Sequence, residues 1–155
     1  MSMLQNRTYD ELNTGDTAAV THRVTERDLI LFATVSGDVN PVHLDEEFAA
    51  ATPFKGRIAH GMLSGALISA AIACELPGPG SIYIGQEMRF LRPVRLGDEI
   101  RIELEILEKL AKNQVRIATR VINQDGKKAV DGVATVMAPT EKASLERPQL
   151  PEVSF

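Results

Sequence analysis

The segment Pro77-Gly78-Pro79-Gly80 divides the sequence into two parts with different hydrophobic periods. Residues 61–75, before it, are apolar nearly all round, as in a buried helix. After it, apolar and polar side chains alternate, as in Ile100 to Ile106. Prolines and glycines end a helix, and a period of two is typical of half-buried strands. This order of elements, a long helix followed by several strands, predicts an α+β fold in which a curved antiparallel sheet wraps one long central helix.

The predicted strands are joined by short turns, so neighbouring strands are expected to be antiparallel. Gln124–Lys127 has the composition of a hairpin turn. The tail from Pro139 to Phe155 has three prolines and little pattern, and is expected to be peripheral or partly disordered. The strands are expected at 17–23, 81–94, 100–106, 115–121 and 128–138.

The region before the long helix contains signals for two shorter helices. Thr25 and Asp28 have the spacing of a capping box, and Gly37 is a suitable terminator for the helix that begins there. Pro41 forbids a continued helix, so the chain after Gly37 is expected to form a fixed turn. A short helix over 45–51 should follow, and a loop after it.

Length and composition exclude several classes of protein. The 155 residues suit one domain, and a formal net charge of −4 argues against a nucleic-acid partner. The single cysteine, Cys74, cannot form an internal disulfide, which fits a reducing cytoplasm. Met1–Asp16 lacks a signal-peptide pattern, and the apolar stretch 62–74 is too short to span a membrane. Metal-ligand spacings and Gly-rich nucleotide motifs are absent from the sequence, so no metal or redox cofactor is predicted.

Asp38 and His43 are the main candidates for chemistry. The carboxylate and the imidazole lie five residues apart on a turn fixed by Gly37 and Pro41. Such a turn can direct two proton-handling groups at one point. The spacing alone leaves an alternative open, in which Asp38 and Asn40 cap turns and His43 packs nearby.

The long helix carries a second candidate feature. Gly61, Gly65 and Ser69 are spaced by four, so they share one narrow stripe that can receive either another backbone or a thin substrate. Gly61 would let a ligand oxygen approach the N–H groups at the start of the helix, as an oxyanion hole requires, or it only relieves crowding there. Ser69 could donate a hydrogen bond to Asp38, or bond back to the carbonyl of Gly65.

The segment from Phe32 to Ala49 resembles the signature of the MaoC-like, hydratase-2 family. Its elements here are Ser36-Gly37-Asp38-Val39-Asn40-Pro41-Val42-His43, with Ala49 at the expected distance. The segments His60-Gly61-Met62 and Ser81–Gln86 add to the resemblance, which covers about residues 17–138. Among members of the family, the chain is most similar to short bacterial (R)-specific enoyl-CoA hydratases.

This resemblance implies a hot-dog fold, with residues 1–155 as one domain and 139–155 as its peripheral tail. It implies a homodimer with the acyl tunnel near the interface. The implied site has Asp38 and His43 as the catalytic pair, Gly61 as the oxyanion-hole donor, and Asn40 and Ser69 as supporting residues. The implied reaction is the reversible hydration of a trans-2-enoyl-CoA to an (R)-3-hydroxyacyl-CoA. Coenzyme A is then part of the substrate, and neither a membrane nor a nucleic acid is a partner.

Three other functions remain open at this stage. The first is the same chemistry on an acyl carrier protein, because a basic mouth formed by Lys55, Arg57 and Arg92 would suit either phosphopantetheine carrier. The second is thioester hydrolysis, in which Asp38 alone activates water, since related folds host several activities. The third is a non-catalytic acyl-CoA-binding module. The pairing of Asp38 with His43 argues against the last two functions.

Overall fold

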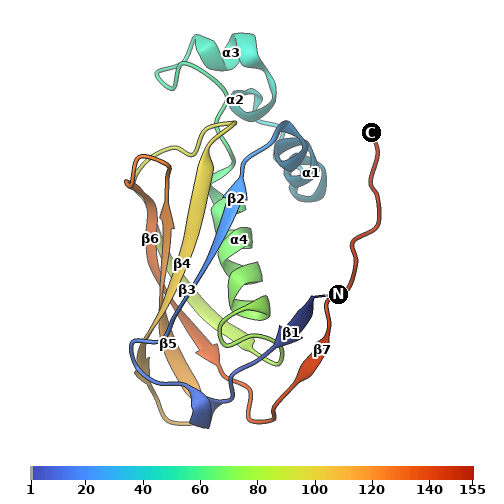
Figure 1. Cartoon of the computed structure of the whole chain (residues 1–155). Helices are drawn as coiled ribbons and strands as arrows, with labels where there is room; N and C mark the ends of the chain where they lie inside the picture. The colour runs from blue at the N-terminus through green and yellow to red at the C-terminus, as the bar shows by residue number, and fades with distance from the viewer. Residues whose placement is uncertain (1) are drawn as a thin grey trace.

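The helix α4 (Gly61–Cys74) lies along one face of a curved sheet in the computed structural model, which describes residues 2–155 (Figure 1). The sheet has five strands in the order β2-β4-β5-β6-β3, and every neighbouring pair is antiparallel. The strands are β2 (Thr17–Arg23), β3 (Ile82–Phe90), β4 (Glu99–Lys109), β5 (Gln114–Ile122) and β6 (Lys128–Met137). The predicted α+β arrangement of a helix wrapped by an antiparallel sheet is confirmed.

The core lies between α4 and the inner face of the sheet. Alternate side chains of β4, from Ile100 to Ile106, are almost fully buried and pack in the same cluster as Ile68 and Ile72 of α4. The period of two therefore fixes which face of each strand meets the helix. Burial of this apolar cluster stabilises the fold through the hydrophobic effect.

Three short helices gather at one end of the sheet (Figure 1). They are α1 (Glu26–Ser36), α2 (Pro41–Leu44) and α3 (Glu46–Ala50). The predicted capping box of α1 is present, because the Thr25 side chain accepts from the Asp28 N–H and Asp28 accepts from the Thr25 N–H. Gly37 ends α1 with φ of 76°, a left-handed conformation that glycine adopts at little cost.

The turn predicted after Gly37 contains a short helix, α2. Pro41 stands at its first position, where the missing N–H and the fixed φ of proline are tolerated. Asp45 caps α3 by accepting a hydrogen bond from the Phe48 N–H at 3.0 Å, as the sequence predicted.

The two ends of the chain pair with each other. Strand β1 (Met3–Gln5) is antiparallel to β7 (Ser144–Glu146), and a 3-10 helix η1 (Tyr9–Glu11) follows β1. Figure 1 shows this small sheet beside the C-terminal end of α4. The tail thus includes one short strand that the sequence pattern did not predict.

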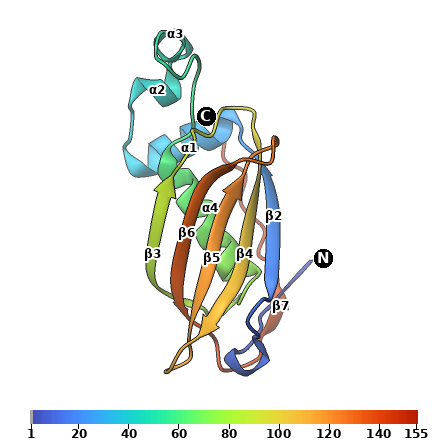
Figure 2. The ribbon, with the colours of Figure 1, turned by 90° about the vertical axis from the view of Figure 1, so that its left-hand side faces the viewer.

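Two apolar surfaces of the single chain remain uncovered. The strand β3 forms one edge of the sheet, as Figure 2 shows, and Ile82, Ile84 and Phe90 on it are about half exposed. One face of α4 is also exposed, with Met62 at 56%. The expectation that α4 is buried all round is therefore corrected, because the sheet covers one side of it only. Within residues 2–155, no helix is long and apolar enough to cross a membrane.

Candidate active site

Asp38 lies in the loop between α1 and α2, and its carboxylate is held by local hydrogen bonds. Its Oδ1 accepts from the Asn40 N–H at 3.1 Å, and its own N–H donates to Ser36 Oγ at 3.1 Å. Asn40 in turn caps α2 by accepting from the Val42 N–H at 3.3 Å. The side chain of Asp38 is 48% exposed in the single chain. Short polar side chains thus fix the loop while the second carboxylate oxygen, Oδ2, stays available.

His43 projects from α2 and is buried. Its Nδ1 lies 2.8 Å from the carbonyl oxygen of Ile58. Since a carbonyl only accepts hydrogen bonds, Nδ1 carries the proton, and Nε2 of the neutral ring has a free lone pair. His43 is therefore oriented as a base whose reactive nitrogen faces Asp38.

The two candidate groups are close but not in direct contact. The distance from His43 Nε2 to Asp38 Oδ2 is 3.9 Å, which is longer than a hydrogen bond. At this separation one water molecule can bond to both atoms. Resting enzymes often show such long distances, which shorten when a substrate binds.

A cavity of about 330 Å³ opens beside His43. It extends from the start of α4 to the end of β3, and apolar side chains dominate its walls. Its lining includes Phe54, Ile58, Gly61, Phe90, Val94 and Val130. A mostly apolar cavity with a few polar groups is typical of a site for a small organic substrate.

Gly61 is the first residue of α4, and it lines this cavity. The N–H groups of a first helical turn have no partner within the helix, and the helix dipole adds a partial positive charge there. A Cβ atom on Gly61 would lie 3.1 Å from Cε1 of Phe90. The glycine therefore lets the Phe90 ring pack close to the start of α4, where a side chain would crowd it.

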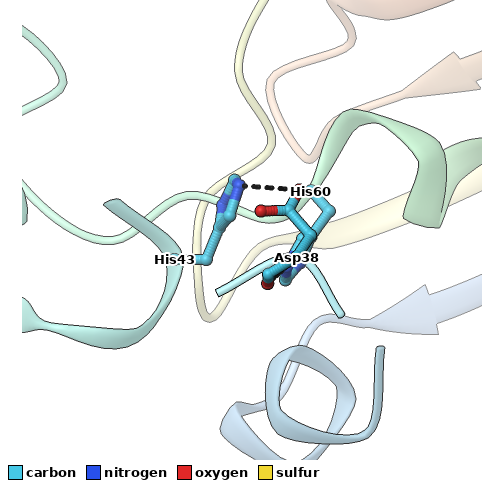
Figure 3. Close-up of side chains that lie close together, drawn as sticks. All are labelled: Asp38, His43 and His60. Carbon is cyan, nitrogen blue, oxygen red and sulfur yellow. Dashed lines mark hydrogen bonds and ion pairs between the residues drawn. The ribbon is translucent and has the colours of Figure 1, made fainter. Parts of the chain in front are cut away.

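His60 precedes Gly61 and is the site residue whose role the sequence analysis missed. It is buried, it lines the cavity, and its ring stacks on His43 with centroids 3.8 Å apart. Its Nε2 lies 3.0 Å from the Asp38 carbonyl oxygen. Figure 3 shows the three side chains of Asp38, His43 and His60 close together. In the sequence, only its position next to Gly61 could have pointed to a role for His60, because a single histidine forms no repeating pattern.

Asp38, His43 and His60 offer ligand atoms within 4.8 Å of one another. The two imidazoles stack 3.8 Å apart at 25°, so their lone pairs lie in separate, nearly parallel planes that do not suit shared coordination of one ion. The arrangement of the three groups suits proton transfer better than metal coordination.

The predicted basic mouth is only partly formed. Arg57 is buried, and its Nε donates to the His43 carbonyl at 2.8 Å while Nη1 bonds to Glu26 at 3.0 Å. The structure therefore places Arg57 beneath α2 and not at the surface as the sequence predicted. Arg92 lines the cavity and Lys55 is exposed, so these two cations remain accessible.

The narrow stripe of α4 formed by Gly61, Gly65 and Ser69 does not lie against Asp38 along its whole length. Gly65 lies in a second hollow beside Met88 and Tyr83. Ser69 follows Gly61 by eight residues, about 12 Å along the helix, and among residues 2–155 it makes no hydrogen bond to Asp38. The serine that does line the cavity is Ser64, on the first turn of α4.

Comparison with known proteins places this helix-and-sheet fold among hot-dog hydratases. The MaoC-like domain model matches residues 7–128, so the chain belongs to the MaoC-like domain family. The structure of the R-hydratase PhaJ1 from Pseudomonas aeruginosa, without ligand, is 64% identical with a TM-score of 0.97, and covers 99% of each chain.

Two curated relatives are also similar. An (R)-specific enoyl-CoA hydratase from Aeromonas caviae is 41% identical over 83% of this chain and 96% of its own. A mitochondrial 3-hydroxyacyl-acyl-carrier-protein dehydratase from Solanum lycopersicum is 34% identical over 73% of this chain and 69% of its own.

Proposed function

We propose that this protein is an (R)-specific enoyl-CoA hydratase, which reversibly hydrates a trans-2-enoyl-CoA to an (R)-3-hydroxyacyl-CoA. The observation that carries the proposal is the pairing of His43 Nε2 with Asp38 Oδ2 at 3.9 Å beside an apolar cavity. The stereochemistry is that of the hydratases at 41% and 64% identity.

The pair handles both protons of the reaction. A water molecule bonded to His43 and Asp38 attacks C3 of the enoyl group and loses a proton to the pair. The pair returns one proton to C2, so that the net change is addition of water across the double bond. Nδ1 of His43 donates to the Ile58 carbonyl throughout, which keeps Nε2 directed at the water.

The start of α4 stabilises the charge that develops between these two proton transfers. As the C3–O bond forms, negative charge moves to the thioester oxygen. The Gly61 N–H and the dipole of α4 provide fixed partial positive charge for this oxygen. Because Gly61 has no side chain and lines the cavity, the thioester oxygen can approach this N–H from the cavity, whose wall also includes the Phe90 ring.

Coenzyme A is the proposed carrier of the acyl group, and no further cofactor takes part. Arg92 lines the cavity and is suited to bind a phosphate of the carrier, with Lys55 as a second exposed cation. An acyl carrier protein is the alternative carrier, since a relative at 34% identity is named as a dehydratase of such substrates. The higher identity to the two bacterial hydratases favours coenzyme A.

A second copy of the chain is the proposed partner. The edge strand β3 offers unpaired backbone groups, and Ile82 and Ile84 on it are exposed. Met62 of α4 is also exposed, beside a hollow that it shares with Tyr83 and Phe90 of β3. Such edges and patches are usually covered. Antiparallel pairing of β3 with its symmetry mate would continue the sheet and bury both surfaces.

The oligomeric state can be tested by sedimentation at micromolar concentration. The native chain should sediment as a dimer, and Ile84→Lys should shift it toward monomer. Leu150→Lys adds the same charge at an exposed tail position and should leave the dimer intact. A native chain that sediments only as a monomer would refute the dimer.

Crotonyl-CoA distinguishes the proposed reaction from its rivals. Loss of the enoyl absorbance without release of free thiol is the expected result. Thiol release would indicate a thioesterase, and binding without any turnover would indicate an acyl-CoA-binding module. Faster turnover of the corresponding acyl-carrier-protein thioester would identify that carrier as the substrate.

A further inference from the structure

The imidazole of His60 is a buried titratable group that the reaction described above does not use. It is 3% exposed and stands at the N-cap position of α4, where its side chain makes no capping hydrogen bond to the helix. Ser, Thr, Asp or Asn would be the usual choice for a cap. The contacts of His60 are made instead with the loop and the helices that carry the catalytic pair.

The first contact ties His60 to the backbone of Asp38. Nε2 lies 3.0 Å from the Asp38 carbonyl oxygen, and a carbonyl only accepts, so Nε2 carries the proton. The other bonds of Asp38 are to its sequence neighbours, Ser36 at the end of α1 and Asn40 in the loop. Among these hydrogen bonds, only that from His60 anchors the Asp38 loop to the start of α4.

The second contact is the stack on His43. The two ring centroids are 3.8 Å apart with an interplanar angle of 25°. On another side, Phe32 of α1 packs against His60 at 4.9 Å and 48°. A single imidazole thus touches α1, α2 and the loop that holds Asp38.

The remaining nitrogen of His60 has no partner. Nδ1 is buried and forms no hydrogen bond within the part of the chain that the structure describes. A proton placed on Nδ1 would have no acceptor, which is costly in a buried site. The hydrogen bond from Nε2 is thus the one polar contact of the ring within residues 2–155, and the geometry suits the ring to a supporting role.

We infer that His60 is a positioning residue, which holds Asp38 and His43 at the separation that one shared water requires. The hydrogen bond from Nε2 sets the position of Asp38, and the stacked face sets the plane of the His43 ring. This inference rests on the proposed function, because it assumes that the two groups act on one water. Displacement of either group by about 1 Å can cost roughly 10²-fold in rate.

Three substitutions separate the two contacts. His60→Ala removes both, His60→Gln keeps an N–H donor without the ring, and His60→Phe keeps a ring without the donor. We expect His60→Ala to lower kcat by roughly 10²-fold with little change in KM. His60→Gln and His60→Phe should each recover part of the lost kcat.

His22→Gln is the matched control, because His22 pairs with Asp28 between β2 and α1 and does not line the cavity. Its kcat should equal that of the native protein, whatever the change in melting temperature. Melting curves recorded for all variants identify the folded fraction to which each kcat refers.

The outcomes distinguish the two claims. Normal kcat in folded His60→Ala, with large losses in Asp38→Asn and His43→Gln, would overturn the inference alone. Equal losses in all three His60 variants would also overturn it, because neither contact would then be restoring function. Normal kcat in Asp38→Asn and His43→Gln would overturn the proposed catalytic pair and the role of His60 with it.

Discussion

The corner that holds Asp38, His43 and His60 and the centre of the sheet are built by different means. In the corner, short helices and turns are fixed by hydrogen bonds to capping side chains and to carbonyl groups, and Asp38 remains half exposed. In the centre of the sheet, side chains such as Ile117 are fully buried and their positions follow from strand register. The proposed catalytic groups thus lie where polar contacts hold the fold together. The side chains expected to contribute most to stability lie where apolar burial holds it together. Substitutions in the two regions should affect different measurements.

The proposed catalytic pair, Asp38 and His43, should show the largest effect on turnover. Asp38→Asn and His43→Gln are nearly isosteric, so each should lower kcat by about 10²–10⁴-fold, the usual contribution of a positioned acid or base. The melting temperature should change little, and KM should move less than kcat. Steady-state kinetics on crotonyl-CoA beside a melting curve checks both. Lost stability with normal turnover per folded molecule would show that the two residues only cap turns.

The centre of the sheet should show the opposite behaviour. Ile117→Ala leaves a cavity in a fully buried position, so the free energy of unfolding should fall by about 2–5 kcal/mol. Denaturant titration measures this loss, and kcat of the folded fraction should remain near the native value. A large fall in kcat at unchanged stability would remove the separation between the two regions.

Gly61 lies at the boundary between the two regions, so Gly61→Ala should have an intermediate effect on kcat. Its Cβ would press on the Phe90 ring at 3.1 Å, and the ring is exposed enough to move toward the cavity. The variant should fold and lose up to roughly 10²-fold in kcat. In Gly65→Ala the new Cβ meets the flexible ends of Met62 and Met88, so a smaller loss is expected there. Full activity in folded Gly61→Ala would remove the oxyanion-hole assignment.

Ser69→Ala should have the smallest effect. The side chain makes no bond to Asp38 within residues 2–155, and it is neither fully buried nor part of the cavity lining. Both kcat and the melting temperature should stay close to the native values. A loss as large as that of Asp38→Asn would require Ser69 to act directly on the reaction.

Much of the fold was predictable because its signals are local and repetitive. The capping box at Thr25, the left-handed Gly37 and the alternation in β4 each act within a few residues, and each is present in the structure. The pairing of β1 with β7 joins three-residue strands from opposite ends of the chain. Strands this short carry no measurable period, so the sequence could not predict them.

From spacing alone, the site was predictable only where residues lie close together in the sequence. Asp38, Asn40 and His43 share one turn, and the structure brings them together. Arg57 looked like a surface cation, yet it is buried through contacts with α1 and α2 that span many residues. The role of His60 likewise depends on a stack with a side chain from another element. Such contacts follow from tertiary packing, which the local pattern does not contain.

The double variant Asp38→Asn/His43→Gln tests the central claim most directly. If both groups act on one water, the second substitution removes little that the first has not already removed, because residues that work as a unit are strongly non-additive. The kcat of the double variant should therefore be close to that of the more damaged single variant, at a similar melting temperature. A kcat reduced by the full product of the two single losses would show that Asp38 and His43 act independently, and would contradict the mechanism.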